Sequence, residues 1–139
     1  MKLNAHVAFR GDCREAFELY ERSLGGKILT MLTYGDTPAG EHVPAEWRSK
    51  IMHATLTLDG NIVLYGADLT PDRYHAPQGF HLAISNSDPD EAQRIFAALS
   101  NGGSVQMPLQ KTFWAVAYGI LTDRFGVSWE INCEASPAT

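Results

Sequence analysis

The chain has 139 residues, of which 45% are hydrophobic and 19% charged, and its formal net charge at pH 7 is −5. That composition is typical of a globular protein, and the length suits one domain or two small modules. The acidic balance, without a dense Lys/Arg run, disfavours binding to nucleic acid or to anionic membranes. Because the sequence shows no leader peptide, no apolar run of about eighteen residues and only two cysteines, we expect a cytoplasmic protein.

A strand is predicted over residues 3–10, where side chains alternate in character. His6 and Arg10 fall on one face of this strand. Val7 and Phe9 fall on the opposite face, which we expect a helix to cover.

The predicted helix begins at Asp12, since Asp12 followed three residues later by Glu15 is typical of a capping box. Apolar residues then recur at helical spacing as far as Gly25-Gly26, where a glycine can end the helix with a positive φ. Residues 27–33 are predicted to form the next strand.

Residues 35–50 are rich in Gly and Pro and show no periodic pattern. A loop of this length is uncommon in a compact domain unless it serves as a lid or a contact. Two alternatives stay open, an ordered lid to which Trp47 contributes and a surface excursion without structure of its own.

Residues 51–58 and 61–66 are predicted to form a hairpin, because Asp59-Gly60 between them is a strong type I′ turn signal. Residues 67–77 contain two prolines and few apolar residues, so we interpret them as a connector.

The pattern then repeats. A strand at 80–84 is followed by the Asp88-Pro89 cap, an apolar helix face and the Gly102-Gly103 stop. A strand begins at Val105, and the stretch 113–133 is predicted to form the last two strands, joined by a turn between Asp123 and Gly126.

The two copies correspond at three points with nearly constant spacing: His6 with His81, Glu15 with Glu91, and Gly26 with Gly103. Such self-similarity indicates two copies of one supersecondary unit. We therefore predict an α+β fold of two βαβββ modules that form curved sheets around a cleft. The modules span residues 1–66 and 78–139, with 67–77 between them.

Alternation also predicts what the sheet faces opposite the helices carry. In the last strand Trp129 and Ile131 would face the helix, which leaves Glu130 and Asn132 on the other side, together with His6 and His81 from the first strands. Two histidines and one carboxylate with open positions suit a divalent ion such as Fe, Mn, Ni or Zn.

Four residues after the hairpin glycines stand Glu130 and Leu64, so Leu64 is the expected counterpart of Glu130. An alternative without metal also stays open, in which the histidines are hydrogen-bonded core residues and Glu130 pairs with Arg10. Further residues expected to contact a small-molecule substrate are Arg10, His53, Leu64, Trp114, Tyr118 and Asn132. No catalytic residue is assigned, and the cysteines are expected to be structural.

Three segments carry a resemblance to a known family: GDCREAFELYERSLGGKI, EWRSKIMHATLTLDG and FWAVAYGILTDRFGVSWEIN. Together they cover most of the chain and resemble the vicinal oxygen chelate superfamily of glyoxalases, bleomycin-resistance proteins and dioxygenases, and within it the PhnB-like branch. The resemblance implies a cleft between curved sheets in a homodimer, with metal ligands on the first and last strands of each module.

Carried over residue by residue, these ligand positions are His6, His81 and Glu130, with Leu64 in the fourth place. Three ligands resemble the dioxygenases and fosfomycin-type transferases more than glyoxalase I. Two hypotheses follow. One is a metal-dependent enzyme of dioxygenase, lyase or transferase type acting on an oxygen-bearing small substrate, and the other is a metal-free protein that sequesters a small molecule.

Overall fold

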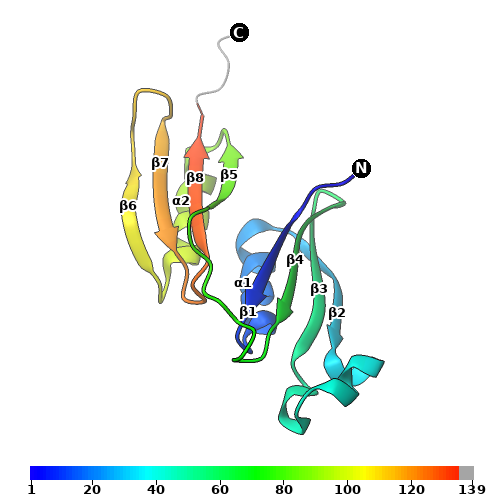
Figure 1. Ribbon diagram of the computed structural model, residues 1–139. Coiled ribbons are helices and arrows are strands. Elements are labelled where there is room, and N and C mark those ends of the chain that lie inside the picture. The colour runs from blue at the N-terminus through cyan, green and yellow to red at the C-terminus, as the bar shows by residue number, and fades with distance from the viewer. Residues whose placement is uncertain (135–139) are drawn as a thin grey trace. The chain divides into compact units, whose positions relative to one another are not determined.

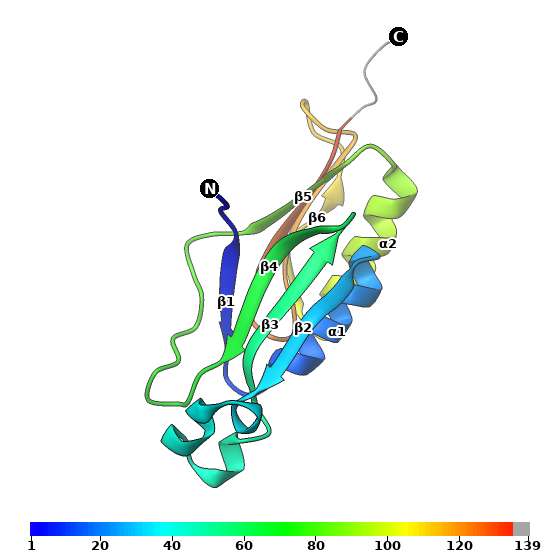
Figure 2. The same ribbon diagram turned by 90° about the vertical axis from the view of Figure 1, so that its right-hand side faces the viewer.

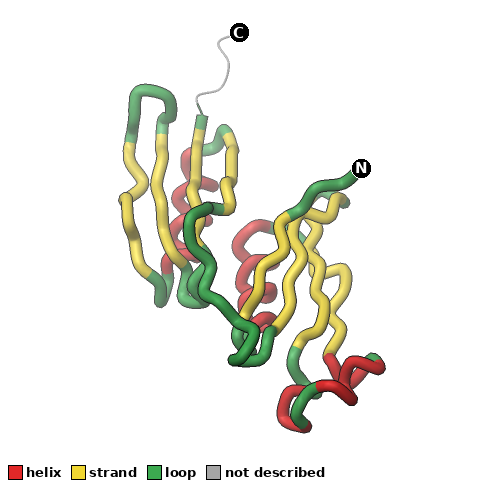
Figure 3. The backbone as a smooth tube through the Cα atoms, viewed as in Figure 1, coloured by secondary structure: helices red, strands yellow, loops and turns green. Residues whose placement is uncertain are grey.

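The computed structural model describes residues 1–134, and the chain divides into two units, Met1–Ala76 and Pro77–Thr139. Each unit holds one long helix and four strands in the predicted order βαβββ (Figures 1 and 3). This confirms the α+β fold of two like modules. The predicted end of the second module at residue 139 lies outside the described residues.

The first module forms one mixed sheet in the strand order β1-β4-β3-β2. Strand β1 pairs parallel with β4, and the other pairs are antiparallel. Helix α1 covers one face of this sheet, as Figure 2 shows in side view. The elements are β1 (Ala5–Phe9), α1 (Cys13–Leu24), β2 (Lys27–Thr33), β3 (Ile51–Leu58) and β4 (Asn61–Asp68).

The core of the first module lies between α1 and the sheet. Val7 and Phe9 are 2% and 1% exposed, which confirms that they face the helix. Gly66 of β4 lies directly beneath the ring of Phe17 and leaves no room for a Cβ atom. We call the opposite face of each sheet, the one without a helix, its open face.

Helix α1 begins differently from the predicted capping box. The side chain of Asp12 makes no capping hydrogen bond. The Cys13 amide instead donates to the carboxylate of Asp68, 3.0 Å away at the end of β4. The capping box is therefore wrong, because a buried carboxylate distant in sequence takes the place of the local cap. The predicted stop is confirmed, since Gly25 has φ 71°.

The predicted end of the hairpin at residue 66 is wrong, because strand β4 continues two residues further and ends at Asp68. The carboxylate of Asp68 is 1% exposed and accepts backbone N–H groups from Gly11, Cys13 and Ile51 at 2.8–3.0 Å. A buried carboxylate needs such partners. Asp68 thereby ties together three segments of the first module.

The long segment after β2 is ordered and consists of three short 3-10 helices: η1 (Tyr34–Asp36), η2 (Pro38–His42) and η3 (Ala45–Trp47). The backbone N–H groups of Tyr34 and Gly35 donate to the carbonyls of Lys50 and Arg48, at 2.9 and 2.8 Å. The Lys50 ammonium group donates to the Gly11 carbonyl at 2.9 Å. The segment is therefore ordered, and the alternative of an excursion without structure of its own is wrong.

The hairpin of β3 and β4 turns at Asp59 and Gly60, both with positive φ (51° and 80°), as a type I′ turn requires. The register between the strands shifts once, so that Val63 is an extra residue opposite Leu56 and Thr57. This bulge displaces every later residue of β4 by one position.

The second module repeats the topology in the order β5-β8-β7-β6, with β5 parallel to β8. Asp88 caps its helix as predicted, and its carboxylate accepts the Asp90 amide at 3.0 Å. The elements are β5 (Leu82–Asn86), α2 (Pro89–Ser100), β6 (Ser104–Gln110), β7 (Ala117–Thr122) and β8 (Ser128–Cys133).

Two predicted strand limits in this module are wrong. Strand β5 begins at Leu82 rather than at residue 80. Residues 113–116 are not part of a strand, because hydrogen bonds between Thr112 and Ala115, both 3.1 Å long, close a turn there. The predicted faces of β8 are confirmed, since Trp129 and Ile131 are 3% and 0% exposed.

The turn between β7 and β8 is built on Asp123, which is 3% exposed. Its carboxylate accepts the amides of Phe125 and Val127 and the indole N–H of Trp129, all at 2.9–3.0 Å. The prediction that Asp123 is a turn residue is confirmed. No helix among residues 1–134 is long and apolar enough to cross a membrane.

Candidate functional site

The open face of the second sheet brings together two of the predicted metal ligands. Strand β8 lies between β5 and β7, and Glu130 pairs with Ala83 of β5 and with Ile120 of β7. His81 immediately precedes β5, and its Nδ1 lies 3.9 Å from Oε2 of Glu130. The two side chains are 40% and 30% exposed, so both can reach a ligand.

Tyr118 of β7 completes the arrangement around the carboxylate. Its hydroxyl donates a 2.8 Å hydrogen bond to Oε2 of Glu130. This bond is the main reason why the pKa of Tyr118 is raised above its ordinary value, with burial second. The bond fixes the orientation of the carboxylate, which is what an outer hydrogen-bond partner does for a metal ligand.

Aromatic rings extend this site along the loop before β7. The edge of Trp114 meets Tyr118 with ring centroids 5.2 Å apart, and Phe113 meets Trp114 at 4.7 Å. Phe113 and Trp114 are 97% and 49% exposed. We call Phe113, Trp114 and Tyr118 the aromatic group. The sequence did not single out Phe113; its signal was an aromatic pair just outside a strand.

Asn132, the last predicted contact of this module, lies next to Glu130 on the same face of β8 and pairs with Tyr118 of β7. Its amide nitrogen donates to Glu134 at 3.2 Å. Its Oδ1 is buried and has no hydrogen-bond partner in the described part of the chain.

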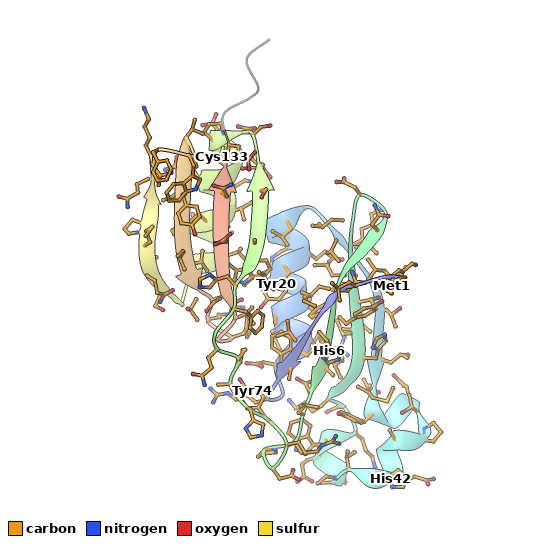
Figure 4. All side chains as sticks on the ribbon, turned by 45° about the horizontal axis from the view of Figure 1, so that its top comes forward. Met1, His6, Tyr20, His42, Tyr74 and Cys133 are labelled. Atoms are coloured by element: carbon orange, nitrogen blue, oxygen red, sulfur yellow. The ribbon has the colours of Figure 1, made fainter. Side chains whose placement is uncertain are left out.

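The first module carries a different set of residues on its open face. His6 is exposed on β1, where Figure 4 labels it, and it pairs with Tyr65 of β4. The ring of Tyr65 stacks on His53 with centroids 5.8 Å apart. His53 therefore lies on the open face. Arg10 follows β1 and is exposed.

Leu64 does not lie on the open face, so this prediction is wrong. Leu64 is 3% exposed and has the same orientation as Gly66, beneath α1. Counting from the turn glycines failed because the two turns differ in length and because β4 contains the bulge at Val63. The open-face residue is Tyr65, which the sequence analysis missed although it alternates with Leu64 and Gly66.

Strand-end hydrogen bonds give the correspondence between the modules. The Leu69 amide donates to the Phe9 carbonyl at 2.8 Å, and the Glu134 amide donates to the Asn86 carbonyl at 2.9 Å. Phe9 thus corresponds to Asn86. By the same register, three further positions of the first module correspond to positions of the second. Tyr65 corresponds to Glu130, His53 to Tyr118, and His6 to Ala83.

His6 and His81 are consequently two residues out of register with each other. A shift of two residues keeps a side chain on the same face of its strand. The repeat therefore predicted the correct face for His81 from an incorrect alignment.

The donor set fits a divalent ion in part. An imidazole nitrogen and a carboxylate oxygen are donors that Zn, Fe, Mn and Ni accept in proteins. Among residues 1–134, no group of three His, Cys, Asp or Glu side chains gathers at one place. Among the His, Cys, Asp and Glu side chains of that range, His81 and Glu130 therefore supply two donors at this place.

Neither cysteine exposes its thiol at the surface of its module. Cys13 and Cys133 are both fully buried. Burial raises the pKa of each thiol above its usual value, and for Cys13 nearby carboxylates raise it further. Both thiols are thus protonated at neutral pH, in accordance with the structural role predicted for them.

Comparison with known proteins supports the assignment of the fold. Residues 2–131 match the model of the Glyoxalase/Bleomycin resistance protein/Dioxygenase superfamily. Protein YjdN of Escherichia coli K12 is 31% identical over 140 residues, which cover 95% of each chain.

Solved structures show the same relationship. Protein PA1353 of Pseudomonas aeruginosa is 43% identical, with a TM-score of 0.88 over 98% of this chain and 99% of that one. A PhnB protein from Bacillus cereus shares the fold at 23% identity, with a TM-score of 0.79 over 96% and 99% of the two chains. The chain belongs to the glyoxalase/bleomycin resistance protein/dioxygenase superfamily.

Proposed function

We propose that this protein is an enzyme that acts on a small oxygen-bearing molecule at the open face of its second sheet, with a divalent metal ion held by His81, Glu130 and His6. The observation that carries the proposal is the 3.9 Å approach of His81 Nδ1 to Glu130 Oε2. Both groups are partly exposed, and His81 immediately precedes strand β5, the neighbour of the strand that carries Glu130, so one ion can contact both of them.

His6 is the proposed third donor, because it is an exposed histidine on the open face of the first sheet. It would come from the first module of the same chain or of a second copy. Three protein donors leave positions free for a substrate. The reaction types that this proposal includes are those of a dioxygenase, a lyase or a transferase.

The residues of the second module would hold and orient the site. Tyr118 keeps the Glu130 carboxylate in one orientation through its 2.8 Å hydrogen bond. Trp114 packs against Tyr118 with ring centroids 5.2 Å apart and would offer an apolar surface to a bound substrate. A bound ion would supply Lewis-acid polarisation of a substrate oxygen.

Metal analysis tests this proposal. The protein is stripped with a chelator, loaded in turn with Mn²⁺, Fe²⁺, Ni²⁺ or Zn²⁺, and freed of excess ion before its metal content is measured. We expect about one ion per chain, since the three donors form one site. Glu130→Gln should lose most of it, because an amide is a weaker ligand than a carboxylate. Glu91→Gln is the matched control on the surface of α2 and should retain the ion.

Retention of no ion by the unaltered protein would overturn the metal proposal, as would equal retention by Glu130→Gln. His6→Ala and His81→Ala locate the remaining donors. If only His81→Ala reduces the metal content, the pair is correct and His6 is not a ligand.

A second candidate function is the metal-free sequestration of a small molecule. The observation in its favour is the aromatic group, whose rings lie exposed beside a carboxylate that is already hydrogen-bonded. Aromatic walls with a few polar groups are typical of small-molecule sites. Native mass spectrometry of protein purified in chelator would detect a retained organic ligand, and Trp114→Ala should lose it.

A further inference from the structure

A separate pocket of about 520 Å³ lies wholly within the first module, between the 3-10 segment and the residues that follow β4. Ligand pockets usually measure roughly 300–1,000 Å³, so this one can hold a small molecule. Figure 4 labels His42, one of its lining residues, on the 3-10 segment. The pocket shares no residue with the proposed metal site.

The walls of this pocket are held by hydrogen bonds. The hydroxyl of Tyr34 donates to the Asp68 carbonyl at 2.6 Å. The Trp47 amide donates to the Pro44 carbonyl at 2.9 Å, and the Arg73 amide donates to the Thr70 carbonyl, also at 2.9 Å. Both sides are thus fixed before any ligand binds, which lowers the entropic cost of binding.

Charges of both signs line the pocket. Arg73 and Glu46 are exposed, and neither side chain makes a hydrogen bond or an ion pair within residues 1–134. Asp72 is different, since a hydrogen bond from the Thr70 hydroxyl lowers the pKa of its carboxyl group. The lining thus carries one guanidinium group, that of Arg73, and two carboxylates, of which Asp72 already accepts the Thr70 hydroxyl and feels the charge of Arg73 while Glu46 makes no such bond.

The rest of the lining is mainly apolar. Trp47 is half-buried, and its indole N–H has no hydrogen-bond partner in the described part of the chain. It thus offers both a flat apolar surface and a free donor. The other apolar residues of the lining are Val43, Pro44, Leu69 and Pro71.

We propose that this pocket binds a small zwitterion with an apolar side chain, which is the chemistry of a free amino acid. Its carboxylate accepts from the Arg73 guanidinium and the Trp47 indole N–H, and its ammonium group donates to Glu46. Its side chain packs against the indole and the prolines. A zwitterion has no net charge, so the acidic balance of the chain does not oppose its approach.

The test is a titration followed by ¹H–¹⁵N NMR of the indole N–H signals. The chain has three tryptophans, and the signal of Trp47 is the one that Trp47→Phe removes. L-Phenylalanine should shift this signal saturably. 3-Phenylpropionate lacks the ammonium group and phenethylamine lacks the carboxylate, so each should bind at least about tenfold more weakly.

Variants assign the two charges. Arg73→Gln should weaken the binding of L-phenylalanine about tenfold and leave phenethylamine unaffected, because the amine never uses that residue. Glu46→Gln should weaken the binding of L-phenylalanine to a similar extent and leave the binding of 3-phenylpropionate unaffected, because 3-phenylpropionate has no ammonium group to donate to Glu46. Arg124→Gln is the control, since Arg124 lies over the ring of Phe125 in the second module.

Three results would each overturn the proposal. They are the absence of a saturable Trp47 shift at millimolar L-phenylalanine, binding of either analogue as tight as that of L-phenylalanine, and unchanged binding of L-phenylalanine by Arg73→Gln. A shift of the Trp114 signal alone would also refute it, because the ligand would then occupy the second module.

Discussion

Tyr65 and Glu130 occupy the same position on the open faces of the two sheets, as the matching strand-end hydrogen bonds show. Their partners correspond as well, since His53 stacks on Tyr65 where Tyr118 donates to Glu130. The two modules thus share one backbone arrangement but carry different functional groups at equivalent positions of their open faces. A carboxylate stands in the second module, and a phenol stands in the first.

The Tyr118 hydroxyl should lose its proton at a higher pH than an ordinary tyrosine does. Its hydrogen bond to Glu130 raises its pKa above the unfolded value of about 10. A raised pKa means that the stability from this bond is fully present below pH 10 and is lost as the pH rises through the folded value. Absorbance near 295 nm, measured against pH, follows phenolate formation. In Tyr118→Phe, the part of the absorbance change that occurs at the highest pH should decrease by the contribution of one tyrosine.

The control for this prediction is Glu130→Gln, because it removes the negative charge of the group that accepts the Tyr118 hydroxyl and should lower the pKa of Tyr118. Loss from the ordinary range in Tyr118→Phe would show that the bond to Glu130 does not persist in solution.

Asp68→Asn should destabilise the first module by about 2–3 kcal/mol. The carboxylate accepts three backbone N–H groups, and one of its oxygens serves Ile51 alone. In the variant, the side-chain NH₂ group of asparagine at the position of that oxygen would meet the Ile51 N–H, so that two donors face each other and no acceptor remains for Ile51. Urea unfolding measures the change. Asp59→Asn is the control and should shift stability by less than about 0.5 kcal/mol, since asparagine tolerates the positive φ of that turn.

Gly66→Ala should cost about 1–3 kcal/mol, because the added methyl group would overlap the ring of Phe17. Phe17→Leu alone should also destabilise the core through lost volume. The double variant should lose less than the sum of the two, since the smaller side chain makes room for the methyl group. Additive losses in thermal or urea unfolding would show that the two residues are not in contact.

The resemblance to the superfamily predicts a homodimer. Sedimentation at micromolar concentrations should give a particle of two chains. A monomer under these conditions would contradict the expectation, and His6 would then have to reach the metal site within one chain. Mixing His6→Ala with Glu130→Gln chains distinguishes the two cases. Sites shared between chains would recover part of their metal content on mixing, whereas sites within one chain would not.

Local sequence signals determined the order of elements in this protein. Alternation, helical spacing and glycine stops predicted βαβββ twice, and Asp59-Gly60 predicted the type I′ hairpin. These signals suffice because each one depends on residues only a few positions apart. Alternation also predicted the open face for Glu130 and the helix-facing side for Trp129.

Only the tertiary structure decided the register and the long-range contacts. The bulge at Val63 and the unequal turns placed Tyr65, and not Leu64, opposite His6. Asp68 replaced Asp12 as the cap of α1 through hydrogen bonds across the module. A period of two specifies which face a residue takes but not how many residues a turn or bulge consumes. That number is set by backbone pairing between strands, which has no signature within a single segment.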